Sequence, residues 1–453
     1  MECTKQLAAF INKTEFHQLP HDVVQQSKLL ILDTLGCATG GYTLASKPVS
    51  WILELVKSQG CTGPSTCLVD GFKTSSAFAA LANGAMIHTV DFDDTHMGSI
   101  AHLGSSLVAT TFALGEQLRS KGTEIITAYI LGFEVAGRIG RSVMPSHYKY
   151  WHPTATLGLF ASAVAAAKLF GLDAEQIEVV IGHAGDQAGG LRYGIEKGDF
   201  SKTLHPGFAA MKGILLASLV KLGSDGPRGI LEYPSGFCKA YSAEPKLELI
   251  SAGLGSSYEV LQDSIKSFPT IQCSHTAIEA TIKLMNQHGL LADDIDEVHI
   301  VQSETVKGQG CNYSPDTPLA ARLSIPYCVA LAITEQRVTI DQFSLEKLKD
   351  SKIRNMMSRI TIEQDPNLNL KYPETITSFV HIRVKNGETF YGSAIYPKGD
   401  PRNRMTSQEV QDKFKTLAAK TFSDTRVEVI IKAVERLEKT ADISEVVELL
   451  VKE

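Results

Sequence analysis

The stretch Phe78-Ala-Ala-Leu-Ala-Asn-Gly-Ala-Met-Ile-His88-Thr-Val-Asp-Phe-Asp-Asp-Thr-His96 joins an apolar segment to a cluster of ionisable side chains. Residues 78–87 are rich in alanine and glycine, and they predict a buried helix. Three aspartates and two histidines follow at once, and His102 comes shortly after them. Imidazoles and carboxylates within hydrogen-bond reach of one another can exchange protons near neutral pH. The stretch therefore predicts acid–base groups at the end of an interior helix, and a polar loop that merely caps the helix is the alternative.

Outward from this stretch, apolar residues recur at helical spacing from Thr4 to about Leu261. Many of these segments are also rich in alanine and glycine, which lets helices approach closely and be buried on most sides. No fixed repeat period is present, so a solenoid is disfavoured. We therefore predict a mainly α fold with a compact helical domain over residues 1–265. Its clearest helices are expected at 23–39, 75–87, 105–119, 125–143, 155–169 and 208–222.

The pattern changes near Lys266 and predicts a smaller α+β domain, a lid, over residues 266–402. Strand-like alternation occurs at 296–302, and two further strands at 378–384 and 389–396 flank the turn Asn386-Gly387. Another strand is expected at 359–363, and helices are expected at 275–287 and 319–334. Amphipathic helices return in the third part, residues 403–453, at 408–419, 426–437 and 444–451. We expect these last helices to pack back on the helical domain.

Composition excludes several classes of function. The formal net charge of -6 over 453 residues gives no basic footprint for nucleic acid, and no basic run indicates a membrane surface. The chain has no uninterrupted apolar run of about 18 residues that would span a bilayer. Its first residues lack a charged segment followed by an apolar one. We therefore expect a cytoplasmic protein without nucleic-acid or membrane partners.

The eight cysteines show no CxxC pair and no zinc-ligand spacing, so we expect no metal site and no disulfide framework. Cys273 has a histidine nearby, at His275, but a free buried thiol is the better interpretation. The glycine-rich run 182–194 lacks the spacing of a nucleotide-binding loop. The chain is accordingly predicted to have no metal site, and residues 182–194 are not expected to bind a nucleotide.

Two further clusters place ionisable groups ahead of predicted helices. His152 precedes the helix 155–169, with Pro153 suited to a first-turn position. Lys202 and His205 precede the helix 208–222. Each histidine alone is more simply a structural residue, but together the clusters predict helix starts that converge on one pocket. Because helix N-termini favour anions, the pocket is expected to bind a small polyanionic molecule.

The chain resembles the MmgE/PrpD family of cofactor-independent enzymes over nearly its whole length. The resemblance is carried by Leu-Asp-Thr-Leu-Gly at 32–36, by 88–96, by Trp-His-Pro-Thr-Ala-Thr-Leu-Gly at 151–158, and by 202–210, 229–232, 236–237, 321–327 and 399–401. Members include dehydratases of 2-methylcitrate, decarboxylases of cis-aconitate and epimerases of iminodisuccinate. The resemblance implies a homodimer in which a large helical domain and an α+β lid enclose a pocket.

Carried over by motif, the pocket residues fall on Asp91, Thr95, His102, His152 and Lys202. The resemblance implies catalytic roles for all of these except Thr95, which is expected to bind substrate, as Lys202 also is. A tyrosine that precedes the Ala-Arg-x-Ser motif would fall near Tyr313 and is a further catalytic candidate. We also expect His205 and His275 to bind substrate.

This chain departs from the decarboxylase pattern in two places beside the pocket. Between Thr95 and His102 it reads His-Met-Gly-Ser-Ile-Ala where a Trp-His-Pro-type stretch is expected. Directly after His102 it has Leu103-Gly104 in place of Pro-Ser. These changes leave the fold unaffected and bear on the choice of substrate.

The family chemistry moves a proton at the carbon α to a carboxylate, and the developing negative charge must be stabilised away from water. We therefore predict a lyase of the dehydratase or decarboxylase type that acts on a small di- or tricarboxylic acid. An epimerase of a similar acid is the main alternative, because the same intermediate can be protonated from its other face. A dimeric carboxylate-binding protein without activity is the third interpretation.

Overall fold

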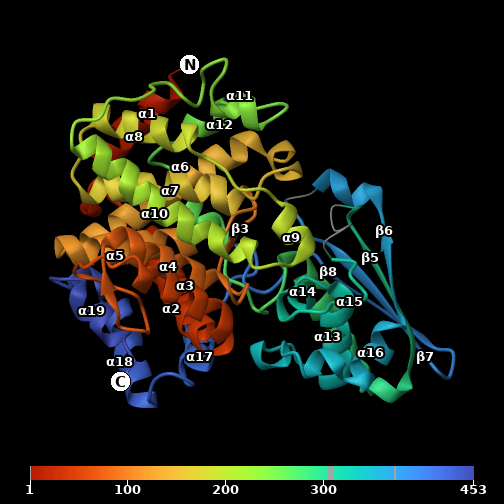
Figure 1. The fold of residues 1–453 in the computed structure, drawn as a ribbon. Coiled ribbons are helices and arrows are strands. Elements are labelled where there is room, and N and C mark those ends of the chain that lie inside the picture. Colours follow the sequence, from red (N-terminus) through yellow and green to blue (C-terminus); the bar gives the residue numbers. More distant parts are fainter. Residues whose placement is uncertain (1, 305–309, 372–373, 453) are drawn as a thin grey trace.

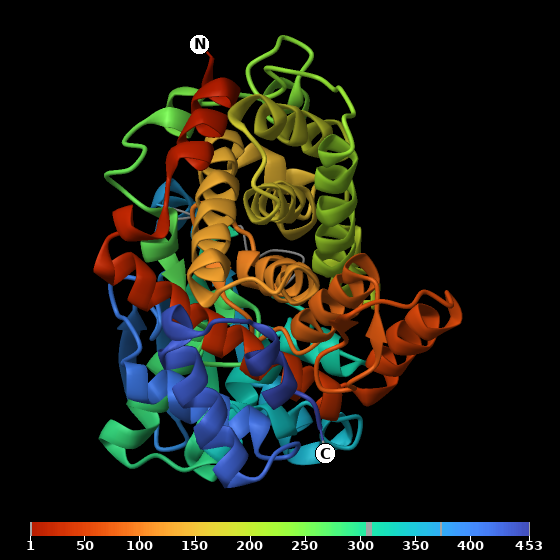
Figure 2. The same ribbon diagram turned by 90° about the vertical axis from the view of Figure 1, so that its left-hand side faces the viewer.

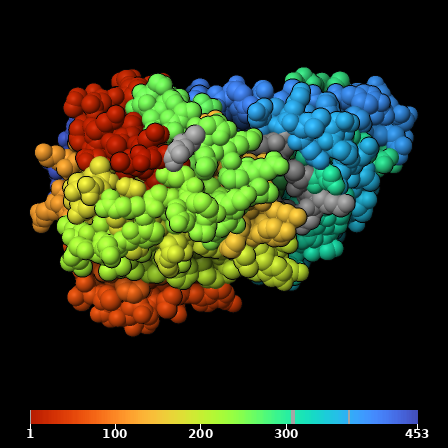
Figure 3. Space-filling view, turned by 90° about the horizontal axis from the view of Figure 1, so that it is seen from above, coloured from red at the N-terminus to blue at the C-terminus, as the bar shows by residue number. Residues whose placement is uncertain are grey.

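The computed structural model describes residues 2–304, 310–371 and 374–452, and it forms a large helical lobe beside a smaller lobe with a sheet (Figures 1 and 3). Each lobe has its own hydrophobic core. The large lobe contains α1 (Cys3–Lys13), α2 (His21–Leu44), α3 (Ser46–Ser58), α4 (Ser76–His88), α5 (Leu103–Leu118), α6 (Gly122–Val143), α7 (Pro153–Leu169), α8 (Ala174–Asp186), α9 (Tyr193–Lys197), α10 (Ser201–Lys221), α11 (Phe237–Tyr241) and α12 (Glu248–Ser251).

The last helices of the chain return to the large lobe, where α17 (Ser407–Ala418) packs on α2 and α19 (Ser444–Leu449) contacts α5. Between them, α18 (Asp424–Glu435) also contacts α2. In Figure 2 these C-terminal helices lie against the N-terminal ones. The core of the large lobe is therefore built from both ends of the chain.

Alanine and glycine bring the central helices of this lobe into close contact. A Cβ atom added at Gly84 on α4 would lie 2.8 Å from the Cα atom of Gly207 on α10. Such an approach is open only to glycine. The sequence-based prediction of closely packed, buried helices is thus confirmed at the crossing of α4 and α10, which brings His88 and Lys202 together.

Among the described residues, α10 is the single helix whose length and apolar composition would allow it to cross a membrane. Half of the relevant window is buried inside the fold, where α10 packs against α4 and α7. A core helix passes the same test of length and composition. We therefore describe α10 as a core helix of the large lobe.

The start of α10 corrects one expectation from the sequence. The helix begins at Ser201 and not near Phe208, so Lys202 and His205 lie inside its first two turns and not ahead of it. Pro206 removes one hydrogen bond, that to the carbonyl of Lys202, and the packing of α10 against α4 and α7 holds the helix together at this point. The His-Pro-Gly sequence read as a helix boundary is therefore helical.

The small lobe contains the four-stranded sheet β6-β5-β7-β8 with helices packed on it. Strand β5 pairs in parallel with β6 and antiparallel with β7, and the predicted hairpin at Asn386-Gly387 joins β7 to β8. The bounds are α13 (His275–His288), β5 (Ile295–Gln302), α14 (Pro318–Arg322), α15 (Ile325–Glu335), α16 (Ser351–Met357), β6 (Ile360–Gln364), β7 (Ser378–Val384) and β8 (Thr389–Ala394).

The single helix expected at 319–334 is divided into α14 and α15. Ser324 lies between them, and its side chain accepts a hydrogen bond from the backbone N–H of Tyr327. Because Pro326 stands in the first turn of α15, both residues favour a new helix start at this point.

Short antiparallel strand pairs connect loops of the large lobe. One pair is β1 (Ser65–Thr66) with β2 (Lys73–Thr74), and the other is β3 (Thr95–His96) with β4 (Asp263–Ser264). The second pair ties the aspartate-rich loop after α4 to the segment that leads into the small lobe. It therefore fixes where the two lobes meet.

Candidate active site

A cavity lies where the two lobes meet, and both lobes contribute side chains to it. The described residues that line it are Asp91, Thr95, Met97, Ile100, His102, Tyr148, His152, Ile195, Lys202, Lys266, Ile271, Gln272, Cys273, Leu323 and Ile376. Five residues predicted from the sequence are among them, namely Asp91, Thr95, His102, His152 and Lys202. The loop after α4, the starts of α5 and α7 and the first turn of α10 supply these five.

Asp91 is the centre of a buried charge cluster. Its Oδ1 atom accepts hydrogen bonds from Lys202 Nζ at 3.0 Å and from Lys266 Nζ at 2.9 Å. Lys266 also donates to the Asp91 backbone carbonyl at 2.9 Å. Burial alone raises the pKa of Asp91, but attraction to the two lysines outweighs burial and holds this pKa well below its ordinary value. Two ammonium groups around one carboxylate leave a net positive charge for an anionic ligand.

The second carboxylate oxygen of Asp91, Oδ2, is buried and has no hydrogen-bond partner among the described residues. Asp91 also adopts a left-handed backbone conformation, with φ of 51°. Aspartate tolerates this region better than most residues, yet such conformations concentrate at functional sites. An unpaired oxygen at the cavity is a ready acceptor for a substrate hydroxyl or for a proton.

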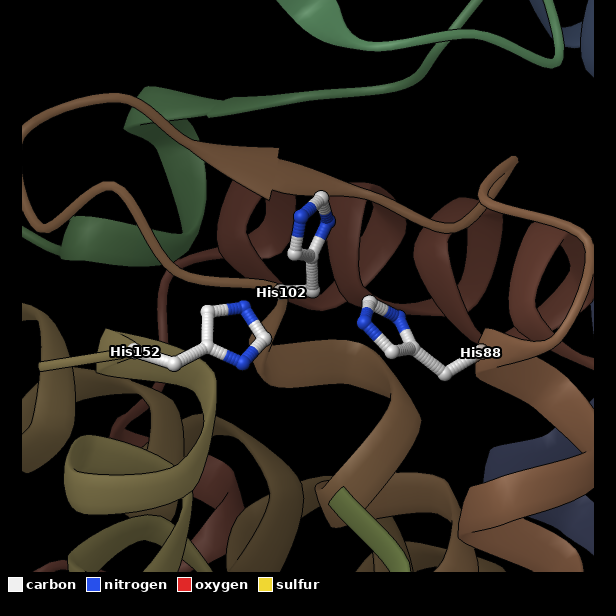
Figure 4. Close-up of side chains that lie close together, drawn as sticks. All are labelled: His88, His102 and His152. Carbon is white, nitrogen blue, oxygen red and sulfur yellow. The ribbon is translucent and has the colours of Figure 1, made fainter. Parts of the chain in front are cut away.

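Three histidines surround the space beside this cluster (Figure 4). His88 ends α4, while His102 and His152 occupy the N-cap positions of α5 and α7. The ring centroids lie 4.9 Å apart for His88 and His102, and 6.4 Å apart for His102 and His152. Figure 4 shows the three rings arranged around this space, each from a different segment of the chain.

At least one nitrogen of each ring is hydrogen-bonded to a neighbouring group. His102 Nδ1 donates to the backbone carbonyl of Asp94 at 2.6 Å, so its Nε2 is the nitrogen that can accept a proton. His88 Nδ1 donates to Asp93 at 2.7 Å, and His88 Nε2 accepts from Lys202 at 3.0 Å. Hydrogen bonds of this kind fix both the tautomer and the orientation of a ring.

His152 is oriented in the same way by His205, since their Nδ1 atoms lie 2.6 Å apart and one of them must donate to the other. His205 does not line the cavity. It therefore contacts the candidate base and not the space for substrate, which differs from the substrate-binding role expected from the sequence.

Burial keeps these imidazoles neutral. It lowers the pKa of His102 to about 3, and attraction to Asp93 offsets this only in part. Burial, together with repulsion from His205 and Lys202, holds the pKa of His152 well below its ordinary value. A bound carboxylate adds negative charge beside both rings, which raises their pKa and makes them better proton acceptors when substrate is present.

Asp94 anchors the start of α5. Its carboxylate accepts hydrogen bonds from the backbone N–H groups of Leu103 at 3.1 Å and Gly104 at 3.0 Å. A Cβ atom at position 104 would lie only 2.4 Å from Asp94 Oδ1, so a larger residue would displace the Asp94 side chain from this position. The Leu103-Gly104 sequence, which departs from the family's Pro-Ser, thus lets a side chain dock at the helix start beside His102.

The three histidines also form the one group of described residues that a metal could join, because a ligand atom of each lies within 4.8 Å of the others. Sequence spacing could not detect this group, since its members come from three separate segments. The geometry does not favour a cation, because the Lys202 ammonium already donates to His88 Nε2 and Lys266 adds a second positive charge nearby. The absence of a metal remains a prediction, now with a physical reason.

Two predicted site residues lie away from the cavity. His275 is fully buried at the start of α13, where its ring packs against Phe268 and its Nε2 is 3.4 Å from the carbonyl of Thr270. Tyr313 is 42% exposed and does not line the cavity. Tyr313 was chosen by counting back from the Ala-Arg-x-Ser motif through a loop of different length. Such a count is a weak guide to where a side chain lies in the fold.

Cys273 does line the cavity, beside the predicted residues. Burial raises the pKa of its thiol to about 12. Because the thiolate is the nucleophilic form, this cysteine is not an activated nucleophile. The raised pKa agrees with the interpretation of Cys273 as a free cysteine.

Three functional candidates were missed from the sequence, namely His88, Lys266 and Gln272. His88 belongs to the first quoted stretch, and its hydrogen bond to Lys202 was the missing information. Lys266 stands where the sequence pattern changes, and only the fold brings it to Asp91. Gln272 carries a buried amide oxygen without a partner among the described residues, and no sequence signal marks it.

Comparison with known proteins gives matches over most of the chain. The family model for the MmgE/PrpD N-terminal domain matches residues 5–250, and that for the MmgE/PrpD C-terminal domain matches residues 268–439. A cis-aconitate decarboxylase of Aspergillus terreus is 29% identical over 99% of this chain and 95% of its own length. A cis-aconitate decarboxylase of Homo sapiens is 27% identical over 99% of this chain and 94% of its own. A 2-methylcitrate dehydratase of Salmonella typhimurium is 26% identical over 86% and 85%.

Proposed function

Because the chain belongs to the MmgE/PrpD family and is an enzyme of its lyase type, we propose that it removes water or carbon dioxide from a small di- or tricarboxylic acid, without a metal or an organic cofactor. The substrate resembles cis-aconitate or 2-methylcitrate. The observation that carries the proposal is the cavity in which Lys202 and Lys266 share one carboxylate beside the neutral rings of His102 and His152.

The two lysines bind the substrate carboxylates. Each lies next to Asp91 Oδ1, and the pair carries one positive charge more than this aspartate balances. Helix α7 begins directly after His152, so its dipole adds further attraction for anions, whereas the first N–H groups of α5 already donate to Asp94. In a buried site these interactions are stronger than in water, because the dielectric constant is lower.

A histidine then moves the proton at the carbon α to a carboxylate. In the dehydratase reaction, one imidazole takes this proton, and the electron pair of the C–H bond enters the carboxylate as an enediolate. The pair then returns to expel a β-hydroxyl group, which takes a proton from the imidazolium and leaves as water. In the decarboxylase reaction, carbon dioxide leaves, and the electron pair that remains on carbon takes a proton from an imidazolium. Both routes place negative charge beside Lys202 and Lys266, which stabilise it.

Epimerisation of a similar dicarboxylate is a second candidate, and the arrangement of the histidines favours it. His102 and His152 come from different helix starts, and their rings lie 6.4 Å apart on either side of one space. A base on one face of the substrate and an acid on the other would invert the carbon between them. His102 and His152 would then exchange protons with a substrate that loses no group.

Incubation of candidate acids with the protein in deuterated water, followed by NMR, separates these reactions. Dehydration produces a vinylic signal, decarboxylation produces carbon dioxide and one solvent deuteron in the product, and epimerisation only incorporates deuterium at the α carbon. A His102→Ala, His152→Ala double variant is the control for exchange outside the site. Absence of all three changes with every di- and tricarboxylate offered would contradict the proposal.

A further inference from the structure

The lining of the cavity includes aliphatic side chains as well as charged ones. Asp91, Lys202 and Lys266 form the charged cluster, with His102 and His152 beside it. The remaining lining is dominated by hydrocarbon. We use the name aliphatic wall for Met97, Ile100, Ile195, Ile271, Leu323 and Ile376.

Both lobes build the aliphatic wall. Met97, Ile100 and Ile195 come from the large lobe, whereas Ile271, Leu323 and Ile376 come from the part of the chain after β4. Met97 and Ile100 fall in the segment 96–101, which departs from the decarboxylase pattern. The segment that departs from the pattern therefore lies at the cavity and contributes hydrocarbon to its surface.

Ile100 is held at the cavity in a strained conformation. Its φ of 52° lies in the left-handed region, which a β-branched residue rarely adopts. Its side chain is nonetheless almost completely buried. Strain of this kind persists where the surrounding structure fixes it, and it concentrates at ligand sites. The conformation sets an aliphatic group against the space for substrate.

The number of cations limits the number of carboxylates that this cavity can hold. Lys202 and Lys266 are its only lysines or arginines among the described lining residues, and each can donate to one substrate carboxylate while it keeps its bond to Asp91. The nearby Arg322 is buried outside the lining and donates to the carbonyl of Thr89. A third carboxylate would have to leave water for the aliphatic wall, where an unpaired charge is strongly disfavoured.

We infer that the substrate carries two carboxylates, held at Lys202 and Lys266, and an aliphatic substituent that packs against the aliphatic wall. This inference rests on the proposed carboxylate chemistry of the same cavity. It narrows the proposed class of di- and tricarboxylic acids to dicarboxylic acids, and so departs from the three carboxylates of cis-aconitate and 2-methylcitrate. The buried amide of Gln272, whose oxygen has no partner among the described residues, offers one further, neutral polar contact in the cavity.

A series of non-reacting dicarboxylates tests the inference by isothermal titration calorimetry. Succinate, methylsuccinate, ethylsuccinate and butylsuccinate differ only in their alkyl group, and propane-1,2,3-tricarboxylate adds a third carboxylate instead. We expect affinity to rise by about threefold for each added methylene group, because each one removes apolar surface from water. Butylsuccinate is expected to bind more tightly than the tricarboxylate.

Two substitutions assign the effect to the aliphatic wall. Ile271→Thr and Ile376→Thr should each weaken butylsuccinate binding by roughly three- to tenfold and leave succinate binding unchanged. The matched control is Ile395→Thr, at an isoleucine that is 48% exposed and outside the cavity, and it should change neither affinity. Thermal melting of each variant confirms that it is folded.

The outcomes separate this inference from the proposed function. Affinity that does not rise with alkyl length, or a tricarboxylate that binds as tightly as butylsuccinate, would overturn the inference and leave the carboxylate chemistry standing. Failure of every compound to bind would contradict both.

Discussion

Lys202 shows how one residue can serve both structure and chemistry. It donates to Asp91 and to His88, and its side chain is almost fully buried at the cavity. The lysine thus links the charged cluster to the histidines. Removing it takes away a positive charge and leaves Asp91 with Lys266 as its only cationic partner among these residues.

The division of labour in the cavity gives the first prediction. Lys202→Ala should raise KM by roughly 10- to 100-fold and lower kcat, because a charge-assisted contact to the substrate carboxylate is lost. His102→Ala and His152→Ala should instead lower kcat by roughly 10²- to 10⁴-fold with little change in KM. Steady-state kinetics measures both. Lys197→Ala, at an exposed lysine on α9, is the control.

Near-normal turnover in both the His102→Ala and the His152→Ala variants would contradict the mechanism proposed above. Asp91 would then be the next candidate for the base, because its Oδ2 atom is unpaired among the described residues. Tyr313 would need a different arrangement of its segment to reach the cavity.

The second prediction concerns metals. Since Lys202 occupies the lone pair of His88 Nε2, we expect activity to survive prolonged chelation and dialysis. Elemental analysis of the active protein should find no stoichiometric zinc or iron. One transition metal per subunit, together with loss of activity on chelation and recovery on its return, would contradict the expectation and assign the metal to His88, His102 and His152.

The third prediction is a pH dependence of stability that arises from buried histidine. Burial lowers the pKa of His275 to about 3, whereas in the unfolded chain this histidine titrates near pH 6.5. Between about pH 6.5 and pH 3 the unfolded chain therefore binds a proton at His275, and the folded chain does not. The stability that the buried neutral ring of His275 contributes is complete above pH 6.5, and it is lost as the pH falls below that value. His275→Gln should therefore make the free energy of unfolding less dependent on pH, by up to about 1.4 kcal/mol per pH unit.

Urea unfolding at pH 7.5, 6.0 and 5.0 measures this difference. His21→Gln is the control, because His21 is exposed at the start of α2. An unchanged slope in the His275 variant would show that the ring is solvated in the folded protein.

At the scale of elements, the crossing of α4 and α10 positions the site. These helices carry His88 and Lys202, and their approach depends on Gly84 and Gly207. A Cβ atom at Gly207 would lie 2.4 Å from the carbonyl oxygen of Leu81. Separation of the helices would break the His88–Lys202 contact before it exposed the core.

The fourth prediction follows from this crossing. Gly207→Ala should destabilise the protein by about 1–3 kcal/mol through overpacking, although alanine is the better helix former. It should also lower kcat, because Lys202 moves with α10. The control is Gly189→Ala, where the added Cβ has no neighbour within 4 Å. Thermal unfolding and kinetics compare the two variants, and equal stability would contradict the close approach.

Periodicity predicted the elements well wherever burial alone decides them. Helices α2, α4, α5, α6 and α7 and the strands around Asn386-Gly387 were expected close to their observed places, because apolar spacing and turn chemistry are local properties. The start of α10 was missed because the His-Pro-Gly sequence is a local stop signal that helix packing overrides. Local patterns are thus weakest where a tertiary contact outweighs a propensity.

The candidate site shows the same limit. Asp91, His102 and His152 were identified because they are dense in sequence or stand before helices. Lys266 lies far from Asp91 in the chain, and its role depends on how the small lobe meets the large one. No spacing rule relates residues that meet only across two lobes, so it could not be found without the fold.

At the scale of the whole molecule, one surface of the large lobe remains apolar. Phe208, Leu215 and Leu219 on α10, together with Leu222 at its C-cap, are between 37% and 85% exposed. Their spacing of seven, eleven and fourteen residues from Phe208 places them on one side of the helix. A continuous apolar stripe of this kind is unusual on the surface of a monomer.

The fifth prediction is that this stripe belongs to a homodimer interface. We expect light scattering to give the mass of a dimer at micromolar concentration, and a two-fold interface would pair the stripe with its copy. The double substitution Leu215→Glu, Leu219→Glu should yield a folded monomer, because it sets like charges opposite one another in an apolar contact. Ile395→Glu, at an exposed isoleucine of the small lobe, should leave the dimer intact.

A monomeric parent protein would contradict the prediction, whereas a dimer that survives the double substitution would place the interface on another surface. Because α10 also carries Lys202, dissociation should lower activity in step with the dimer fraction if the interface holds this helix in position.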